Sequence, residues 1–507
     1  MYRRRLSIIT ISLLPIYGWL AYSIWRDWDV DQNIRRLLYY KSNEWHVNTS
    51  IIFPEDPDFA KRSERWTNFC QPKFSIIVSP ATEVDVVAIV KFATVHNIPF
   101  IATGGHHGYS TNLGKLVKGL AIDLSLLNLV EVFTGNSTLV VGGGTRWGQI
   151  LDPVYEAGFE MRVVGTTIGG GIGRYSGRYG MISDSLISAN VVTADGRLVK
   201  VSETLNSDLF WGIRGAGASF GIITQATYKL WRVDRQNLVM NADFVLNSDM
   251  SNSYFDLLES YDTSMAENLA IVSMIIYNEK TNAAHILANW VYLGQEEEGL
   301  GAIKPFLELQ PSISSVSMVP WNKLLASQGL GIVDTMFCQN NQTRSLYSAN
   351  VRRFPASTSK IAFEKMEKLY AEYPSARASS LSLEMFPNQA AMAQGSDATA
   401  YPWRDARGNM IFLSQWEDNG HGLSTDVLEL STRLGQSIRD AFAKTSEYHQ
   451  LSVYVSYAHG DESLEQVFGI EKLPRLTALK KKWDSQNVFG YSHALPTGYP
   501  PIQALVL

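Results

Sequence analysis

The chain has 507 residues, a formal net charge of −5 and a hydrophobic fraction of 45%. A single hydrophobic core stops growing well below this length, so we expect two folded domains. The net charge and the lack of a long basic run exclude a typical nucleic-acid-binding protein. The two cysteines, Cys70 and Cys338, are too few for a disulfide framework, although one bridge between them remains open. No Cys-x-x-Cys or His-x-x-x-His spacing occurs, so the sequence predicts no metal site.

Residues 1–26 form an apolar segment that we predict to be an uncleaved signal anchor. Three arginines at positions 3–5 precede the uncharged stretch Leu6–Trp25, which is long enough to span a bilayer. Arginines on this side favour a cytosolic N-terminus, with the rest of the chain in the lumen or outside the cell. The alternative is a cleaved signal peptide and a secreted protein, although no small-x-small cleavage site follows the run. Both topologies make the sequons available for glycosylation, and these lie at Asn48, Asn136 and Asn341.

A polar stem, residues 27–67, leads into a first domain that we place at residues 68–232. The expected elements of this domain are a strand at 75–80, a helix at 83–97, strands at 98–103, 120–128 and 137–145, and a helix at 146–158. Strand, helix and strand in close succession indicate an α/β unit. Asp195-Gly196 lies between two runs rich in β-branched residues, which predicts a hairpin turn.

Residues 233–450 have a different pattern and are predicted to form a second, substrate-shaping domain. Strands are expected at 269–277 and 285–293, and helices at 357–373 and 422–444. An antiparallel sheet covered by helices fits this pattern. The tail, residues 451–507, returns to a strand at 451–458 and then a basic helix at 475–483.

Glycine clusters recur at several expected loops of the first domain: Gly104-Gly105, Gly142–Gly144, Gly169–Gly171 and Gly215-x-Gly217. The Gly169, Gly171, Gly173 spacing with Asp195 downstream invites comparison with a Rossmann dinucleotide loop. Asp195 is better explained as a hairpin residue, and the run does not open the first βα unit of the domain. Glycines at loop after loop instead indicate a bound dinucleotide that backbone amides approach from several sides.

Five blocks of sequence carry a family resemblance: "PFIATGGHHGYST", "LVVGGGTRWGQI", "GGGIGRYSGRYG", "SETLNSDLFWGIRGAGASFGIIT" and "RLTALKKKWDSQNVF". The chain resembles the FAD-linked oxidases with a PCMH-type FAD-binding domain, and within them the fungal berberine-bridge-enzyme-like oxidoreductases. This resemblance implies an α+β fold in which the tail rejoins the first domain to complete the FAD-binding part. It also implies an enzyme that uses FAD.

The resemblance implies roles for particular residues. His106 occupies the position of the histidine that relatives bond to the flavin, whereas His107 is interpreted as a polar loop residue. Residues expected to cradle the pyrophosphate are Thr103, Gly104, Gly105, Gly108 and Ser110. Residues expected beside the adenine or the flavin are Gly169, Gly170, Gly171, Gly173, Gly221, Ile222 and Asn487. Some relatives have a second, cysteinyl flavin bond, but residues 161–167 contain no cysteine and look shortened, so we expect a single link.

Tyr457 matches a catalytic tyrosine of the family and is the predicted base for the substrate proton. Tyr454, three residues earlier, would face the other side of a strand, so we expect only one of the two tyrosines to reach the flavin. Residues 399–416 resemble a segment beside the family's active site, and the candidate substrate residues there are Arg404, Tyr401, Trp403 and Trp416. Arg404 is equally well explained as a structural ion-pair partner.

The sequence thus predicts a membrane-anchored flavin oxidase that moves a hydride from an alcohol or activated carbon of a small metabolite to FAD. Molecular oxygen is the expected electron acceptor, and secondary metabolism is the expected setting. The alternatives are a flavin dehydrogenase, an oxidative cyclase, a carbohydrate oxidase, and a non-catalytic binding protein that retains the fold.

Overall fold

A computed structural model describes residues 34–38, 44–161, 167–233, 238–333, 337–416 and 425–499. The chain divides into two compact units, Met1–Thr49 and Ser50–Leu507. In the first unit, residues 34–38 are helical, and Thr49 N–H donates to the His46 carbonyl in a turn at 2.8 Å. Among the helices of the described ranges, none is both long and apolar enough to cross a bilayer. The predicted anchor, Leu6–Trp25, lies outside the described residues and stays a prediction.

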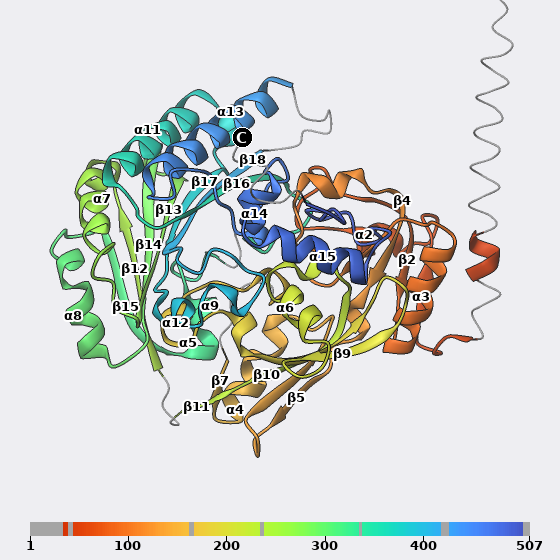
Figure 1. Cartoon of the computed structure of the whole chain (residues 1–507). Helices are drawn as coiled ribbons and strands as arrows, with labels where there is room; N and C mark the ends of the chain where they lie inside the picture. Colours follow the sequence, from red (N-terminus) through yellow and green to blue (C-terminus); the bar gives the residue numbers. More distant parts are fainter. Residues whose placement is uncertain are drawn as a thin grey trace, which may run out of the picture. The chain divides into compact units, whose positions relative to one another are not determined.

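The second unit begins with a four-stranded sheet in the order β1-β2-β4-β3 (Figure 1). Its strands are β1 (Ser50–Ile52), β2 (Lys73–Ser79), β3 (Phe100–Thr103) and β4 (Val117–Asp123). β2, β4 and β3 are parallel, and α3 (Glu83–Val95) connects β2 to β3, as the strand–helix–strand pattern predicts. Because β1 pairs with β2, residues 50–67 belong to this unit, and the predicted stem was wrong in its second half.

A five-stranded antiparallel sheet follows, in the order β5-β6-β10-β8-β9. Its strands are β5 (Val130–Phe133), β6 (Thr138–Gly142), β8 (Leu186–Val192), β9 (Leu198–Ser202) and β10 (Ile222–Lys229). The β8–β9 hairpin confirms the predicted turn, in which Gly196 has φ +72° and a conformation that suits glycine. The helix expected at 146–158 begins later, as α4 (Leu151–Glu156). Smaller elements are α2 (Phe59–Ser63), α5 (Ser176–Tyr179), α6 (Ser207–Ala216) and the β7–β11 pair (Phe159–Glu160 and Trp231–Arg232).

The predicted substrate-shaping region contains a seven-stranded antiparallel sheet in the order β15-β12-β14-β13-β17-β18-β16. Its strands are β12 (Leu238–Leu246), β13 (Leu269–Asn278), β14 (Ala283–Tyr292), β15 (Ile313–Pro320), β16 (Thr343–Val351), β17 (Ser380–Met385) and β18 (Gly408–Trp416). One face is apolar and packs against helices (Figure 1): α7 (Ser251–Ser260), α8 (Glu296–Leu307), α11 (Ala356–Glu372) and α13 (Thr425–Thr445). These elements confirm the predicted helix-covered antiparallel sheet.

The opposite face of this sheet is polar although much of it is buried. Alternation along the strands directs Asn241, Asp243, Glu384 and Asn409 to this face, away from the helices. A polar sheet face without solvent needs polar partners. Asn289 of β14 bonds to Asn241 and Asp243, and Tyr457 of the candidate active site bonds to Glu384.

The tail does not form the strand predicted at 451–458. Its apolar alternation instead occupies a loop and a 3-10 turn, η12 (Val455–Tyr457). The backbone groups bond to scattered partners: Asn350 N–H donates to the Ser452 carbonyl, and Val453 N–H donates to the Gln466 carbonyl. Edge strand β16 lies beside this segment and bonds to it through Asn350 and Ser348 without forming a ladder, so alternation of side chains alone does not produce a strand. The predicted basic helix is confirmed as α15 (Leu473–Trp483), and it follows α14 (Leu464–Phe468).

Candidate active site

His106 lies in the loop that leaves the carboxyl end of β3. Its φ is +61°, an uncommon conformation for a residue with a side chain, and neighbouring bonds hold it there. His106 Nδ1 lies 2.8 Å from the Glu64 carbonyl oxygen, and Trp66 N–H donates to the His106 carbonyl. A carbonyl only accepts, so Nδ1 carries the proton and Nε2 keeps its lone pair. Burial lowers the pKa of His106, so the imidazole is neutral at neutral pH.

Three loops without side-chain bulk converge beside His106. A Cβ on Gly104 would lie 3.7 Å from the Gly143 carbonyl oxygen, which places the first two glycine clusters side by side. A Cβ on Gly143 would lie 2.1 Å from the Ile223 carbonyl oxygen, next to the predicted Gly221-Ile222 backbone. These backbones lie where only glycine fits. The structure therefore brings together loops that the sequence predicted to surround a dinucleotide.

Two hydroxyls of the His106 loop have no partner. Thr103 Oγ1 and Ser110 Oγ are buried, and neither makes a hydrogen bond in the described structure. Buried polar atoms are nearly always paired with protein, water or ligand. Hydroxyls beside glycine backbone suit the phosphate oxygens of a dinucleotide, so the residues present fit FAD.

The glycine loop at residues 169–171 packs against the tail and the 399–416 segment. Gly170 and Gly171 have φ values of +117° and +78°, and Gly171 N–H donates to Tyr454 Oη at 3.1 Å in a buried setting. A Cβ on Gly170 would lie 2.9 Å from the Tyr401 ring. The preceding stretch, residues 162–166, lies outside the described residues, so the shortening inferred from the sequence stays a prediction.

Tyr454 and Tyr457 lie side by side, and the prediction that they face opposite sides was wrong. In the 3-10 turn, residues three apart align, and their ring centroids are 5.0 Å apart at an interplanar angle of 83°. Tyr109 Oη donates to the Ser456 carbonyl at 2.5 Å, and Thr111 N–H donates to the His459 carbonyl at 2.8 Å. The predicted base and the predicted flavin tether therefore lie on two segments that are hydrogen-bonded to each other.

Glu384, which sequence analysis missed, completes this site. Tyr457 Oη donates to Glu384 Oε1, and Asn409 Nδ2 donates to Glu384 Oε2, each at 3.4 Å. Burial raises the pKa of Glu384 to about 7, although the positive charge of Arg174 opposes this shift. Burial and the Glu384 charge raise the pKa of Tyr457 well above its usual value. The only sequence signal was one acid in the alternating strand "SLSLEM", and that signal lacks a known motif.

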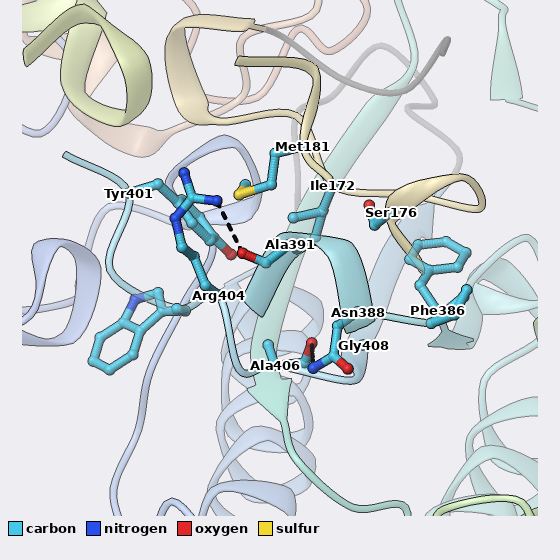
Figure 2. A pocket seen from close by; sticks show the side chains of 12 residues that line it. Ile172, Ser176, Met181, Phe386, Asn388, Ala391, Tyr401, Arg404, Ala406 and Gly408 are labelled. Carbon is cyan, nitrogen blue, oxygen red and sulfur yellow. Dashed lines mark hydrogen bonds between the residues drawn. The ribbon is translucent and has the colours of Figure 1, made fainter. Parts of the chain in front are cut away.

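Arg404 forms a buried ion pair with Asp184, which favours the alternative that the sequence left open. Figure 2 shows its hydrogen bond to Ala391. Its guanidinium donates to Asp184 at 2.7 and 3.0 Å, and further donors reach the Ala391 carbonyl and Thr399 Oγ1. Arg404, Tyr401 and Trp403 border one small cavity with a volume of about 20 Å³. That volume holds about one water molecule, so this cavity is not the site of a metabolite. The role of these residues toward substrate stays a prediction.

Trp416 and Asn487 lie farther along their segments. Trp416 ends β18 and packs edge-to-face on Phe69, with ring centroids 5.8 Å apart. Asn487 is exposed in the turn after α15, where Phe489 contacts Phe100 at the start of β3. Their predicted contacts with substrate and flavin stay predictions.

The residues predicted for glycosylation are accessible. Asn48, Asn136 and Asn341 are all exposed. Cys70 and Cys338 are exposed as well, and no disulfide joins them.

Comparison with known proteins identifies the family. The model of an FAD-binding domain matches residues 74–202, and the model described as berberine and berberine-like matches residues 453–496. FAD-linked oxidoreductase fogF of Aspergillus ruber is 43% identical over 479 residues, covering 92% of this chain and 95% of fogF. The chain belongs to the berberine-bridge-enzyme-like FAD-linked oxidoreductases. It is an FAD-linked oxidoreductase with an FAD-binding domain, as the resemblance implied.

Other relatives of this oxidoreductase agree in family and fold. FAD-linked oxidoreductase srdI of Neurospora crassa is 39% identical, covering 89% of this chain and 90% of srdI. BBE-like 1 of Physcomitrella patens has a TM-score of 0.77 at 20% identity, covering 89% of this chain and 98% of that one. A glucooligosaccharide oxidase of Acremonium strictum has a TM-score of 0.77 at 20% identity, with 89% and 97% covered. The two solved structures confirm the α+β fold of this oxidoreductase family.

The convergence of the loops predicts a sharp difference between two glycines of one segment. Gly143→Ala would place a Cβ 2.1 Å from the Ile223 carbonyl oxygen, whereas Gly148→Ala meets nothing within 4 Å. We expect Gly143→Ala to lower both the melting temperature and the bound-flavin content, because backbone must move. Gly148→Ala should match the wild type in both measurements. Equal flavin content in the two purified variants would contradict the proposed convergence of backbone around the cofactor.

Proposed function

We propose that this oxidoreductase removes a hydride and a proton from an alcohol or an activated carbon of a small metabolite and passes the electrons to oxygen. The observation that carries the proposal is the Tyr457–Glu384 pair, held next to the His106 loop by the Tyr109–Ser456 hydrogen bond. FAD, when bound, supplies a two-electron acceptor that oxygen reoxidises. Relatives named FAD-linked oxidoreductases in several fungi support a role in secondary metabolism.

The chain's own part in this chemistry is to accept the substrate proton. A phenol whose pKa is raised well above its usual value is almost entirely protonated at neutral pH, so it accepts a proton only if it gives its own away. Glu384, with a pKa of about 7, is partly ionised at neutral pH and accepts the Tyr457 hydrogen bond. We infer that the substrate hydroxyl gives its proton to Tyr457 Oη while Tyr457 gives its own proton to Glu384. Glu384 then holds the proton until it exchanges with solvent.

His106 is proposed to hold the flavin covalently through its ring. Its neutral imidazole and its fixed position in the loop suit a nucleophilic ring nitrogen. The Acremonium strictum glucooligosaccharide oxidase has a flavin described as 6-S-cysteinyl, 8α-N1-histidyl FAD. Residues 161–167 of the present chain contain no cysteine, so the proposal is a single histidyl link.

Replacing His106 tests the link directly. Wild-type protein should keep its yellow absorbance after denaturation and filtration, because a covalent bond survives unfolding. His106→Ala should release any bound FAD into the filtrate under the same treatment. His107→Ala is the matched control and should retain the flavin. Release of all flavin from the wild type would refute the tether, and a colourless wild type that takes up no FAD would refute the flavoenzyme.

The pH dependence tests the proton-accepting pair. Glu384 has a raised pKa, so it is protonated and inactive below about pH 7 and becomes competent as pH rises through that value. The rate of anaerobic flavin reduction should therefore increase through about pH 7 and then level off. Glu384→Gln should remove this limb and lower the rate roughly 10²- to 10⁴-fold, as expected for loss of a general base. Tyr457→Phe should lower it comparably.

The substrate panel and controls make this test specific. The panel should contain alcohols, benzylic metabolites and oligosaccharides, because a xylooligosaccharide oxidase of Myceliophthora thermophila shares the fold with a TM-score of 0.75. Substrate-dependent peroxide release would distinguish an oxidase from a dehydrogenase. Tyr277→Phe, whose hydroxyl bonds to Asn282 in an exposed loop, is the control for loss of a phenol. Full-speed reduction by Glu384→Gln at neutral pH would remove the carboxylate from the mechanism.

We also propose that residues 1–26 anchor the protein in a membrane with the body in the lumen. The support is the uncharged Leu6–Trp25 stretch behind three arginines, together with three exposed sequons. Alkaline carbonate should leave the full chain in the membrane pellet and release a variant that lacks residues 1–26. Removal of N-glycans should increase its mobility, and Asn136→Gln should reduce that shift. Release of the full chain by carbonate would contradict the anchor.

A further inference from the structure

Arg65 is a buried cation in the segment that precedes β2. Its side chain belongs to a residue only 4% exposed, and both Nε and Nη1 are fully buried without a hydrogen-bond acceptor in the described structure. A buried guanidinium normally has its donors paired, because desolvating a charge is costly. An arginine with two unpartnered nitrogens therefore indicates a missing anion.

The position of Arg65 against the His106 loop is well defined. Arg65 Nη2 donates to the Gly108 carbonyl at 3.1 Å, and the Arg65 carbonyl accepts from Asn341 N–H at 2.7 Å. The next residue, Trp66, donates its N–H to the His106 carbonyl. A Cβ on Gly108 would lie 2.9 Å from Arg65 Nη2 and 3.0 Å from Leu113 Cδ1, so a larger residue would shift the guanidinium. The side chain of Arg65 and the backbone of the next residue are thus both bonded to the loop that carries His106.

The charges around this loop lack a balancing anion. Burial, and after it the positive charges of Arg146, Arg65 and Arg344, lower the pKa of His107, and burial lowers the pKa of Arg65 to about 10. Arg65 therefore remains charged at neutral pH. The acid at the end of β4, Asp123, is already bonded to Arg62 at 2.9 Å and to Ser79. No described carboxylate is close enough to perturb the pKa of Arg65, for which burial is the sole cause of the shift.

We propose that Arg65 binds the pyrophosphate of FAD, together with the backbone and hydroxyls of the His106 loop. This inference rests on the flavin function proposed above. A pyrophosphate carries two negative charges and accepts charge-assisted hydrogen bonds from a guanidinium. The unpartnered hydroxyls of Thr103 and Ser110 lie on the same loop, as do Gly104 and Gly105. An anionic substrate could also bind a guanidinium through its oxygens, and the experiment distinguishes such a substrate from the pyrophosphate of FAD.

The experiment titrates FAD and riboflavin into flavin-free full-length protein that carries His106→Ala, with binding followed by flavin fluorescence. Riboflavin has the isoalloxazine but no phosphate, so it reports on the fold of the flavin end alone. In this background, Arg65→Gln should weaken FAD binding roughly 10- to 100-fold, as expected for a lost charge-assisted bond. Glutamine removes the charge and ends two bonds before the terminal guanidinium nitrogens, so the riboflavin titration reports whether loss of the Gly108 contact disturbs the loop. Arg65→Lys should be intermediate.

The controls and outcomes are decisive. Arg377→Gln, a part-buried arginine bonded to Tyr370 and Asn282 in the sheet region, should bind FAD as tightly as the parent. Weaker FAD binding with unchanged riboflavin binding supports the proposal. Equal weakening for both ligands would show a structural role, and unchanged FAD binding would assign the arginine to another anion such as the substrate; either overturns it. If the wild type is colourless and the His106→Ala protein binds neither FAD nor riboflavin, the flavin function itself is overturned.

Discussion

The active site depends on a short set of hydrogen bonds between two segments about 350 positions apart in the sequence. Tyr109 Oη reaches the Ser456 carbonyl, and Thr111 N–H reaches the His459 carbonyl. The first segment carries His106, and the second carries Tyr454 and Tyr457. Ser348 Oγ donates to the Tyr457 carbonyl and ties the same turn to β16. Together with the hydrogen bonds between Thr67 and Arg344, which join the segment before β2 to β16, these bonds fix the loop, the turn and the sheet relative to one another.

The seven-stranded sheet contributes chemistry because its two faces differ. Its apolar face is covered by helices, and the opposite face holds carboxylates and amides that water does not fully solvate. Glu384 on β17 pairs in register with Asn409 on β18, so an amide lies directly beside the carboxylate. Such burial disfavours the ionised carboxylate and raises the pKa of Glu384 to about 7. A residue that is costly for stability is thereby suited to accept and release a proton.

Arg404 and Arg65 are both buried, and their hydrogen-bond partners distinguish a structural role from a ligand-binding role. Arg404 has a carboxylate, a carbonyl and a hydroxyl as partners, and its charge is balanced by Asp184. Arg65 has one carbonyl partner and no carboxylate near enough to perturb its pKa. The sequence left Arg404 open as either a substrate-binding residue or a structural ion-pair partner. The hydrogen-bond inventory favours the structural role for Arg404 and points to Arg65 as the ligand-binding arginine.

Much of the fold was predictable from local pattern. Helical spacing at 83–97 and 357–373, strand patterns at 269–277 and 285–293, and the Asp195-Gly196 turn all correspond to observed elements. These signals are local: they depend on side-chain periodicity and turn chemistry within one segment. The exceptions were residues 451–458, which lie beside β16 without forming a ladder, and the part of the predicted stem that pairs as β1 with β2. Strand pairing is decided by distant segments, so alternation alone does not reveal it.

The sequence by itself indicated a bound dinucleotide, because glycines recur at several loops, whereas the predicted role of His106 came only from the family resemblance. It also determined the family, through five blocks of matching residues. Only the tertiary structure brought Glu384 next to Tyr457, since the two lie 73 positions apart and the strand of Glu384 has no motif. It also decided that Arg404 is paired and that Arg65 lacks an anion. Burial and hydrogen-bond satisfaction are properties of packed three-dimensional neighbours, and a linear sequence does not state which groups will be neighbours.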